Sequence, residues 1–389
     1  MEFSFTEEQQ MIRDTAEAFL AEVSTSAAVR TAMNTEQGYD EALWQRVCSE
    51  LYWQAIHIPE THGGLGLGYV ELAAMLEQMG RYLFCSPFYA TVCLATNAIL
   101  AAGSEEQQGR WLPAVLDGQT ATLAWTGPSG RWDAGSVEGT WERSADGFRL
   151  DGRWRYVPDG HSAQLLVVAA REAGSEGSDG IGLFVVPADT PGVSRQWLPT
   201  MDQTRKQGEI LLQGVSVGSD AVLGEAGTAG SALATVIDLA AVAIAADQVG
   251  VAQQALDSSV AYMQERVQFG RVIASYQSLK HKAADMMLRA EAARSALYYA
   301  ACVADEALQG GSLGAGLPEA ASIAKAYCSE AAFFNAGCGI QLHGGVGFTE
   351  EYDIQLYFKR AKSTETFLGN ASYHRERLAA MLLDGEAAA

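Results

Sequence analysis

Three glycines stand within four residues in the segment Gln341-Leu342-His343-Gly344-Gly345-Val346-Gly347. Glycine lets a backbone turn tightly and lets another group approach it closely. A helical run follows, and it carries the cations Lys359, Arg360 and Lys362. Backbone amides at a turn between helices, with positive charge beside them, suit an anionic ligand such as a pyrophosphate. A plain turn between two helices explains the glycines equally well.

A second segment upstream favours the ligand hypothesis. The chain reads Glu265-Arg266-Val267-Gln268-Phe269-Gly270, and Gln277 follows on a new helix. Together the two segments resemble the acyl-CoA dehydrogenase family of flavoproteins, in which R-x-x-F-G and Q-x-x-G-G segments hold the adenosine and pyrophosphate of FAD across a subunit interface. The resemblance runs from Met1-Glu2-Phe3-Ser4-Phe5-Thr6 to the last helix, with its motifs in the family order. It assigns FAD binding to Arg266, Gln268, Phe269, Gln277, Gln341, Leu342, Gly344 and Gly345.

The reaction of that family requires a carboxylate. The resemblance implies that a glutamate removes the α proton of an acyl-CoA thioester while the flavin accepts a hydride from the β carbon, and burial must raise the pKa of that glutamate. One family position for it precedes the glycine of a Y-E-G-T pattern, where this chain reads Phe367-Leu368-Gly369-Asn370. The other falls at Ala240 or Ala241, counted from Ala245–Gly250. Neither leucine nor alanine accepts a proton, so we assign no catalytic residue.

Two carboxylates lie near these positions in the sequence. Asp238 stands about half a helical turn from Ala240, and Glu365 precedes Leu368 by most of a turn. We expect both to be solvated or to cap helices, and a relocated base is the alternative. His343 and His374 are expected to be loop and surface residues.

The residues that would hold the flavin ring also depart from the family. A family loop resembling T-E-P-G-A-G-S-D supplies backbone donors to the isoalloxazine, and here it reads Thr126-Gly127-Pro128-Ser129-Gly130-Arg131-Trp132-Asp133. A second element resembling W-I-T-N-G bonds the flavin through its threonine, and here it reads Tyr156-Val157-Pro158-Asp159-Gly160. Pro158 has neither a hydroxyl nor an amide hydrogen. The chain therefore resembles the family at the residues that bind the adenosine end of FAD and departs from it at the residues that bind the flavin ring.

One subunit of a heteromeric complex would need only such a partial set. In the family, one subunit supplies the ring pocket and its neighbour the adenosine end; paired unlike subunits with one FAD per pair occur in the branch that acts on steroid and sterol side-chain CoA thioesters. The Gln341–Gly345 and Tyr373-His374-Arg375 segments resemble that branch. We therefore expect a non-catalytic subunit of an α2β2 acyl-CoA dehydrogenase, sharing FAD with a homologous catalytic subunit. The alternatives are an active homotetramer with a base at Asp238 or Glu365, and a scaffold of the same fold without redox chemistry.

Charge and composition exclude other classes of partner. Lys and Arg number 26 against 47 Asp and Glu, a net charge of −21, so neither nucleic acid nor an anionic membrane is expected to bind. The six cysteines form no C-x-x-C pair, and most stand in apolar context, which indicates reduced core residues of a cytoplasmic protein. No apolar run is expected to span a membrane, and the acidic N-terminus is not that of a signal peptide.

The order of the expected elements gives the fold class, α+β. Helices are expected over 1–117, from a capping box at Thr6-Glu7-Glu8-Gln9 and including Tyr69–Arg81 and Pro87–Ala102. Short β-rich runs between Gly, Asp and Pro indicate a small antiparallel barrel or sandwich over 118–228. Alanine-rich helical sequence indicates a bundle over 229–389. This order is also the one that the acyl-CoA dehydrogenase resemblance implies.

Overall fold

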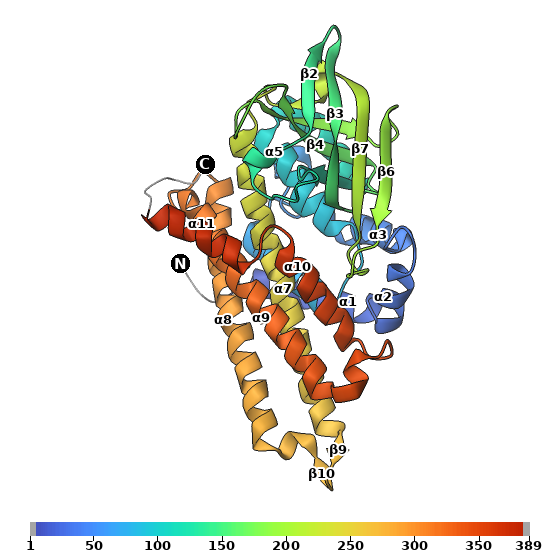
Figure 1. The fold of residues 1–389 in the computed structure, drawn as a ribbon, viewed down its shortest axis with the longest axis vertical. Coiled ribbons are helices and arrows are strands. Elements are labelled where there is room, and N and C mark those ends of the chain that lie inside the picture. The colour runs from blue at the N-terminus through green and yellow to red at the C-terminus, as the bar shows by residue number, and fades with distance from the viewer. Residues whose placement is uncertain (1–4, 384–389) are drawn as a thin grey trace. The chain divides into compact units, whose positions relative to one another are not determined.

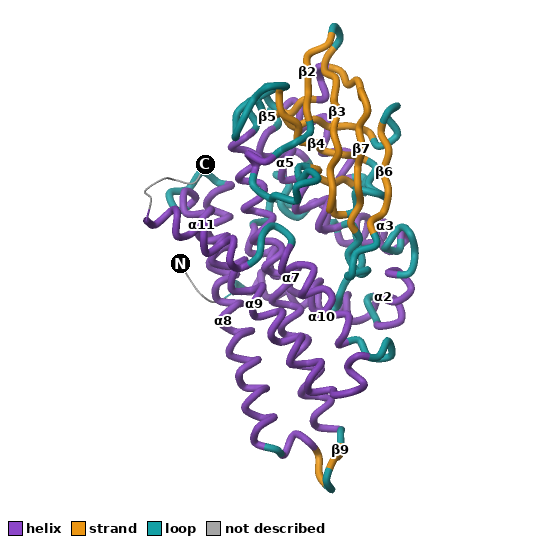
Figure 2. Tube along the Cα trace, in the orientation of Figure 1, coloured by secondary structure: helices purple, strands orange, loops and turns teal. Residues whose placement is uncertain are grey.

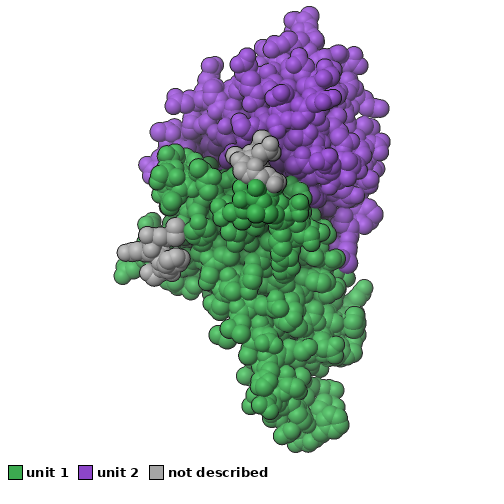
Figure 3. All heavy atoms as spheres, turned by 60° about the vertical axis from the view of Figure 1, so that its left-hand side comes forward, with its two compact units in different colours: residues 1–31, 69–84, 241–388 green, residues 32–68, 85–240, 389 purple. Residues whose placement is uncertain are grey.

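The computed structural model describes residues 5–383 and divides into two compact units, coloured separately in Figure 3. Unit 1 consists of Met1–Thr31, Tyr69–Phe84 and Ala241–Ala388, and unit 2 of Ala32–Gly68, Cys85–Ala240 and Ala389. Each unit therefore combines segments that are far apart in the sequence. The three domain limits expected from the sequence remain predictions, and their outer ends at residues 1–4 and 384–389 lie outside the described residues.

Unit 1 is helical, with long helices running alongside one another (Figure 1). Its helices are α1 (Glu7–Val23), α2 (Ser26–Met33), α4 (Tyr69–Arg81), α7 (Gly230–Glu265), α8 (Gln277–Leu308), α9 (Leu317–His343), α10 (Ile354–Thr366) and α11 (Ala371–Leu383), of which α2 and α7 continue into unit 2. The predicted capping box is confirmed, because Thr6 accepts the Gln9 amide hydrogen and the Gln9 side chain accepts that of Thr6.

The helix α7 corrects one expectation from the sequence. An 18-residue window of this helix has a mean hydropathy of 1.7, which is long and apolar enough to cross a membrane. The expectation that no apolar run reaches that length is therefore wrong. Of this window, 78% is buried inside the structure. A buried core helix has this composition too, so the window is weak evidence for a membrane span.

Unit 2 contains an eight-stranded sheet, drawn in orange in Figure 2, with the order β6-β7-β3-β2-β4-β5-β8 and β1 paired with β4. The strands are β1 (Ala121–Ala124), β2 (Thr140–Ser144), β3 (Gly147–Pro158), β4 (Leu165–Glu172), β5 (Ile181–Pro187), β6 (Val193–Leu198), β7 (Gln207–Gly218) and β8 (Val222–Leu223). Most pairs are antiparallel, as expected, whereas β1 and β2 pair with β4 in parallel. The sheet matters for the site because β1 leads into the Thr126–Asp133 loop and β3 ends at Pro158.

The helices that lie wholly in unit 2 are short, and two of them adjoin π-helical turns. They are α3 (Glu41–Arg46), α5 (Asn97–Ala102) and α6 (Glu105–Leu116). A π-helical turn over Val47–Leu51 extends α3, and another over Tyr89–Thr96 precedes α5, within the helix expected over Pro87–Ala102. All six cysteines are free thiols and five are buried, which confirms their expected core character.

Candidate functional site

One end of the helical bundle in unit 1 carries the first candidate segment. After α7 ends, β9 (Val267–Gln268) and β10 (Arg271–Val272) form a hairpin with Phe269 and Gly270 at its tip (Figure 1). Both tip residues have positive φ, 55° for Phe269 and 78° for Gly270. Glycine adopts this conformation readily, whereas a bulky residue there is strained. The Phe269 side chain is also 93% exposed. Neither burial nor local geometry explains a phenylalanine at this position.

Arg266 joins α7 to this hairpin and has a fixed backbone. Its N–H donates to the Tyr262 carbonyl at 2.9 Å, and its carbonyl accepts from the Ile273 N–H at 2.8 Å. Its side chain is exposed, and no carboxylate among residues 5–383 forms an ion pair with its guanidinium. Gln268 and Gln277 are exposed as well. The segment therefore presents an open cation at Arg266, and exposed amide side chains follow it at Gln268 and at the start of α8.

The second candidate segment begins at the C-terminus of α9 and lies at the same end of the bundle. Leu342 packs with Ile273 in a buried cluster that joins α9 to the hairpin, so its side chain faces the core. Gln341, Gly344 and Gly345 are exposed. Gly344 has φ 64° and ψ −140°, close to a region open only to glycine. A Cβ on Gly344 or Gly345 would meet no atom within 4 Å, so the backbone here is open to an approaching group.

The cations expected beside the glycine turn are engaged elsewhere. Arg360 has no exposed surface, and its Nη1 lies 2.9 Å from Oδ1 of Asp247, which is equally buried. Lys362 pairs with Glu365 at 2.7 Å. The prediction that these cations serve an anionic ligand is wrong for Arg360, because it is buried and neutralises Asp247. For Lys362, whose side chain is 41% exposed, it stays a prediction. Arg266 instead has an exposed guanidinium at this end of the bundle, with no ion pair to residues 5–383.

The corner between α10 and α11 holds Leu368 at a family position for the base. Leu368 is 1% exposed and has φ 61°. Its carbonyl accepts a hydrogen bond from Nε2 of His374 at 2.9 Å. Nζ of Lys325 donates to the carbonyls of Gly369 and Glu365, at 2.8 and 3.2 Å. Lys325 of α9 and His374 of α11 therefore hold the corner in place around the apolar side chain of Leu368.

Burial controls the ionisation of these two side chains. It lowers the pKa of Lys325 to about 7, although Ser329 Oγ at 3.0 Å joins the two carbonyls as an acceptor for its ammonium. Burial and, next, the charge of Lys325 lower the pKa of His374 to about 3. His374 is 2% exposed, so its expected surface location is wrong. It is neutral at pH 7 and holds the corner as a hydrogen-bond donor.

The other candidate acids and bases also differ from expectation. Asp238 is 2% exposed on α7, so the expected solvated role is wrong. Ala240 and Ala241 are buried as well, at 0% and 1%. His343 is 7% exposed, and its Nδ1 donates to the Gly339 carbonyl at 2.7 Å, so it is not a surface loop residue.

In unit 2, two backbone N–H groups of the loop after β1 already donate hydrogen bonds within the chain. The Ser129 N–H donates to Glu138 Oε1 at 2.9 Å and the Gly130 N–H to the Gly127 carbonyl at 3.1 Å. The Pro158 carbonyl accepts from the Thr122 hydroxyl at 2.6 Å. One polar group is left over, since the Thr126 hydroxyl is buried without a hydrogen-bond partner among the described residues. Of the groups considered in these loops, only the Thr126 hydroxyl is therefore left without a partner among the described residues, and Pro158 offers no donor.

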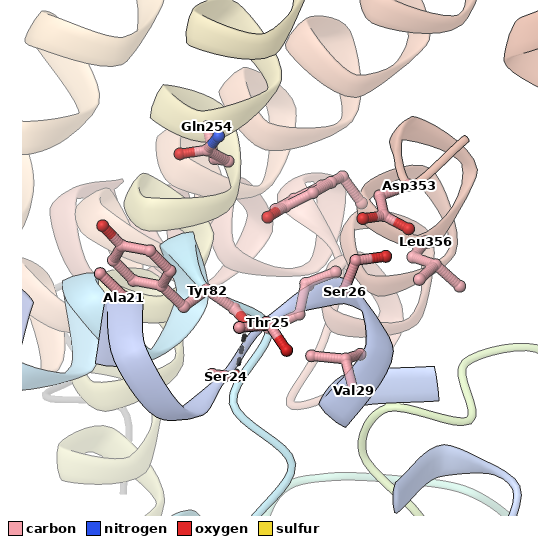
Figure 4. A pocket seen from close by; sticks show the side chains of 11 residues that line it. Ala21, Ser24, Thr25, Ser26, Val29, Tyr82, Gln254, Asp353 and Leu356 are labelled. Atoms are coloured by element: carbon pink, nitrogen blue, oxygen red, sulfur yellow. Dashed lines mark hydrogen bonds between the residues drawn. The ribbon is translucent and has the colours of Figure 1, made fainter. Parts of the chain in front are cut away.

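A pocket of about 220 Å³ in unit 1 lies between the α1–α2 corner, the end of α4, and helices α7 and α10 (Figure 4). Its polar groups bond to the chain itself. Ser24 Oγ donates to the Tyr82 carbonyl at 2.9 Å, Asp353 accepts from Arg30 at 2.5 Å, and Gln254 accepts from Arg81 at 3.1 Å. A pocket whose polar groups are already paired offers a ligand little recognition.

Two functional contributors were missed from the sequence. Lys325 is a single lysine in an alanine-rich stretch, and its partners Glu365 and Gly369 lie 40 and 44 residues away. Tyr262, which stacks on His343, stands in an ordinary helical run. A lysine within an otherwise apolar helical pattern was the one available signal, because such a side chain needs buried partners.

Comparison with known proteins agrees with this geometry. Family models described as acyl-CoA dehydrogenase N-terminal, middle and C-terminal domains match residues 6–119, 122–215 and 230–383. Acyl-CoA dehydrogenase IpdE2 of Mycolicibacterium smegmatis is 31% identical over 375 residues, covering 96% of this chain and 99% of the relative. The ChsE4-ChsE5 complex from Mycobacterium tuberculosis has a chain with a TM-score of 0.88 at 27% identity, covering 100% of both chains. A variant of the Tcur3481-Tcur3483 steroid ACAD has a TM-score of 0.84 at 32% identity, covering 97% of this chain and 98% of that one. The chain belongs to the acyl-CoA dehydrogenase family, whose members are FAD-binding oxidoreductases acting on CH–CH bonds.

Proposed function

We propose that this chain is the base-lacking subunit of a heteromeric acyl-CoA dehydrogenase and holds the adenosine and pyrophosphate end of an FAD shared with a homologous catalytic subunit. The observation that carries the proposal is the contrast between two corners of unit 1. The end of the bundle is open, with a strained and exposed Phe269. The corner at the base position is closed around Leu368.

The open end fits the adenosine side of FAD. Arg266 offers a guanidinium that forms no ion pair with the described part of the chain, and a charge-assisted bond to a phosphate is stronger than a neutral one. The glycine turn allows close approach, since no atom would meet a Cβ at Gly344 or Gly345. Phe269 presents a flat apolar face on which a base could stack. The strained backbone of Phe269 costs free energy, which the binding of a ligand can offset. Stacking of the adenine of a shared FAD on the Phe269 ring would provide that offset.

Proton abstraction belongs to the partner under this proposal. Leu368, Ala240 and Ala241 are all buried and apolar at the family's base positions. FAD, when bound, supplies the hydride acceptor, and the residues of this chain only orient its adenosine end. Pro158 offers no hydrogen-bond donor, and the Ser129 N–H already donates to Glu138. This chain is therefore not expected to hold a flavin ring of its own.

The relatives support the heteromeric form and suggest the substrate class. One structural relative is a complex of two named chains, and another is described as a steroid ACAD. We infer an α2β2 assembly, an acyl-CoA substrate with a steroid-type side chain, and a cytoplasmic location that suits six free thiols.

Flavin content tests the proposal. The chain purified alone should be nearly colourless, and it should yield yellow protein only when produced with its catalytic partner. Full FAD occupancy in the isolated chain would contradict the heteromeric assignment.

One observation favours a second candidate, an active homotetramer with a relocated base. Asp238 is buried, and burial is what raises the pKa of a catalytic carboxyl. That candidate requires yellow, active protein from the chain alone.

A further inference from the structure

We propose that His343 is a positioning residue, and that its stacking on Tyr262 sets the spacing between the two halves of the cradle formed by Arg266 and by Gly344–Gly345. The inference rests on the proposed function, because it concerns the same adenosine and pyrophosphate site.

His343 occupies a packed position at the end of α9. Its ring stacks on Tyr262, with centroids 4.4 Å apart and planes at 23°. Tyr352 closes the cluster edge-on, with its centroid 6.0 Å from His343 and 6.2 Å from Tyr262. The Nδ1–H donates to the Gly339 carbonyl, one turn back in α9. The ring therefore has one orientation, fixed by a hydrogen bond and by two aromatic neighbours.

This pair connects the two segments through their backbones. The carbonyl of Tyr262 accepts the N–H of Arg266 at 2.9 Å, so Tyr262 lies directly beneath the residue that carries the guanidinium. His343 is bonded to Gly344. Stacked rings keep a close centroid separation. The stack therefore fixes how far the end of α7 lies from the end of α9.

The turn after His343 folds back onto it. A Cβ on Gly347 would lie 2.8 Å from the Ile340 carbonyl and 3.2 Å from Cβ of His343. The turn over Gly344–Phe348 therefore rests on the His343 residue. Burial lowers the pKa of His343 below its usual value, so the ring is neutral at pH 7 and keeps the Nδ1–H bond. The histidine thus supports the cradle without adding a charge to it.

Two substitutions separate the stack from the hydrogen bond. His343→Phe keeps an aromatic ring and loses the Nδ1–H donor. His343→Asn keeps a donor near the Gly339 carbonyl and loses the stack. His62→Asn, on a partly exposed histidine of unit 2, is the matched control. ADP is the probe, because it carries the adenosine and pyrophosphate groups and needs no ring pocket.

Isothermal titration of ADP into the full-length chain measures the effect. We expect His343→Asn to weaken ADP binding by about tenfold, the equivalent of one lost aromatic pair, with His343→Phe and the control close to the unchanged chain. Tyr262→Leu should weaken it similarly, and adding it to His343→Asn should change little further. Amide hydrogen exchange over 341–349 should be faster in His343→Asn.

The outcomes are distinguishable. If the unchanged chain binds ADP and His343→Asn binds it equally well, the positioning role is overturned while the proposed function stands. If His343→Phe is the weakened variant, the hydrogen bond and not the stack sets the turn, which also overturns the inference. If the unchanged chain shows no affinity for ADP, the inference is overturned, and the flavin content of the complex still tests the proposed function separately. Unfolding midpoints of all variants show that the comparison is between folded proteins.

Discussion

Replacing Leu368 by glutamate should destabilise the chain in a pH-dependent way, although it restores a carboxylate at the family's base position. Leu368 is 1% exposed, and hydrogen bonds from His374 and Lys325 hold its corner. Burial of a leucine contributes about 1.5–3 kcal/mol. Burial of an unpaired polar group costs about 1–3 kcal/mol. Leu368→Gln, which has the shape of glutamate without its charge, should therefore lower the free energy of unfolding by about 2.5–6 kcal/mol.

The charge of Leu368→Glu adds a further loss at high pH. Burial raises the pKa of a carboxyl group, so the folded value should lie above the unfolded value of about 4.3. Stability relative to Leu368→Gln is then lost as pH rises from about 4.3 to the folded pKa, by about 1.4 kcal/mol for each unit. A folded pKa of about 7 makes this difference about 4 kcal/mol at pH 8.

Urea unfolding at pH 5 and pH 8, followed by tryptophan fluorescence, measures this difference. Leu382, which is 72% exposed on α11, provides the matched control, and its Glu and Gln variants should unfold alike. Equal stability of Leu368→Glu and Leu368→Gln at pH 8 would refute the reasoning, since the carboxylate would then have reached water or a hydrogen-bond donor such as Nζ of Lys325. Under the proposed function, the variant should also give no additional dehydrogenase turnover in the complex, because the partner supplies the flavin-ring contacts.

Three further predictions follow from the same geometry. Arg266→Ala should weaken FAD retention by the complex by about 10–100-fold, the worth of one charge-assisted bond, as measured by flavin fluorescence on dilution; a structural role alone would change stability and leave retention intact. Asp238→Asn and Glu365→Gln should each leave the turnover of the complex within a few-fold, whereas loss of a true general base lowers it about 10²–10⁴-fold. Burial lowers the pKa of His57 to about 4, so its contribution to stability falls as pH drops from about 6.5 to about 4, by up to about 3 kcal/mol; His57→Leu should show a shallower acid unfolding profile by circular dichroism.

Periodicity and turn residues predicted the elements well, because both act locally. The helix expected over Tyr69–Arg81 has those limits in the structure. The two motif segments were expected to share one ligand, and the Leu342–Ile273 cluster brings them to one end of the bundle.

Partners far apart in the sequence explain what was missed. His374 and Asp238 were expected at the surface because each is a polar residue in a helical run. Whether such a residue faces water or another helix depends on packing between segments, which one sequence does not encode locally. Arg360 and Asp247 form an ion pair although they lie 113 residues apart in the sequence. Without knowledge of that partner, an arginine between two lysines was interpreted as part of a binding site.

Under the proposed function, a chain without a catalytic base still needs a rigid helical bundle. Helices α4 and α7 approach so closely that a Cβ on Gly250 would lie 1.9 Å from the Glu77 carbonyl, and one on Gly80 would lie 2.1 Å from that of Asp247. The buried Arg360–Asp247 pair ties α10 to α7, and Lys325 ties the α10–α11 corner to α9. Removing one partner of a buried ion pair costs about 3–5 kcal/mol, so these ties resist rearrangement. A binding site needs supporting residues that hold its groups within about 0.5 Å. The rigid helices therefore have a use at the open end of the bundle, where Arg266 and the glycine turn would have to meet a pyrophosphate that another subunit positions.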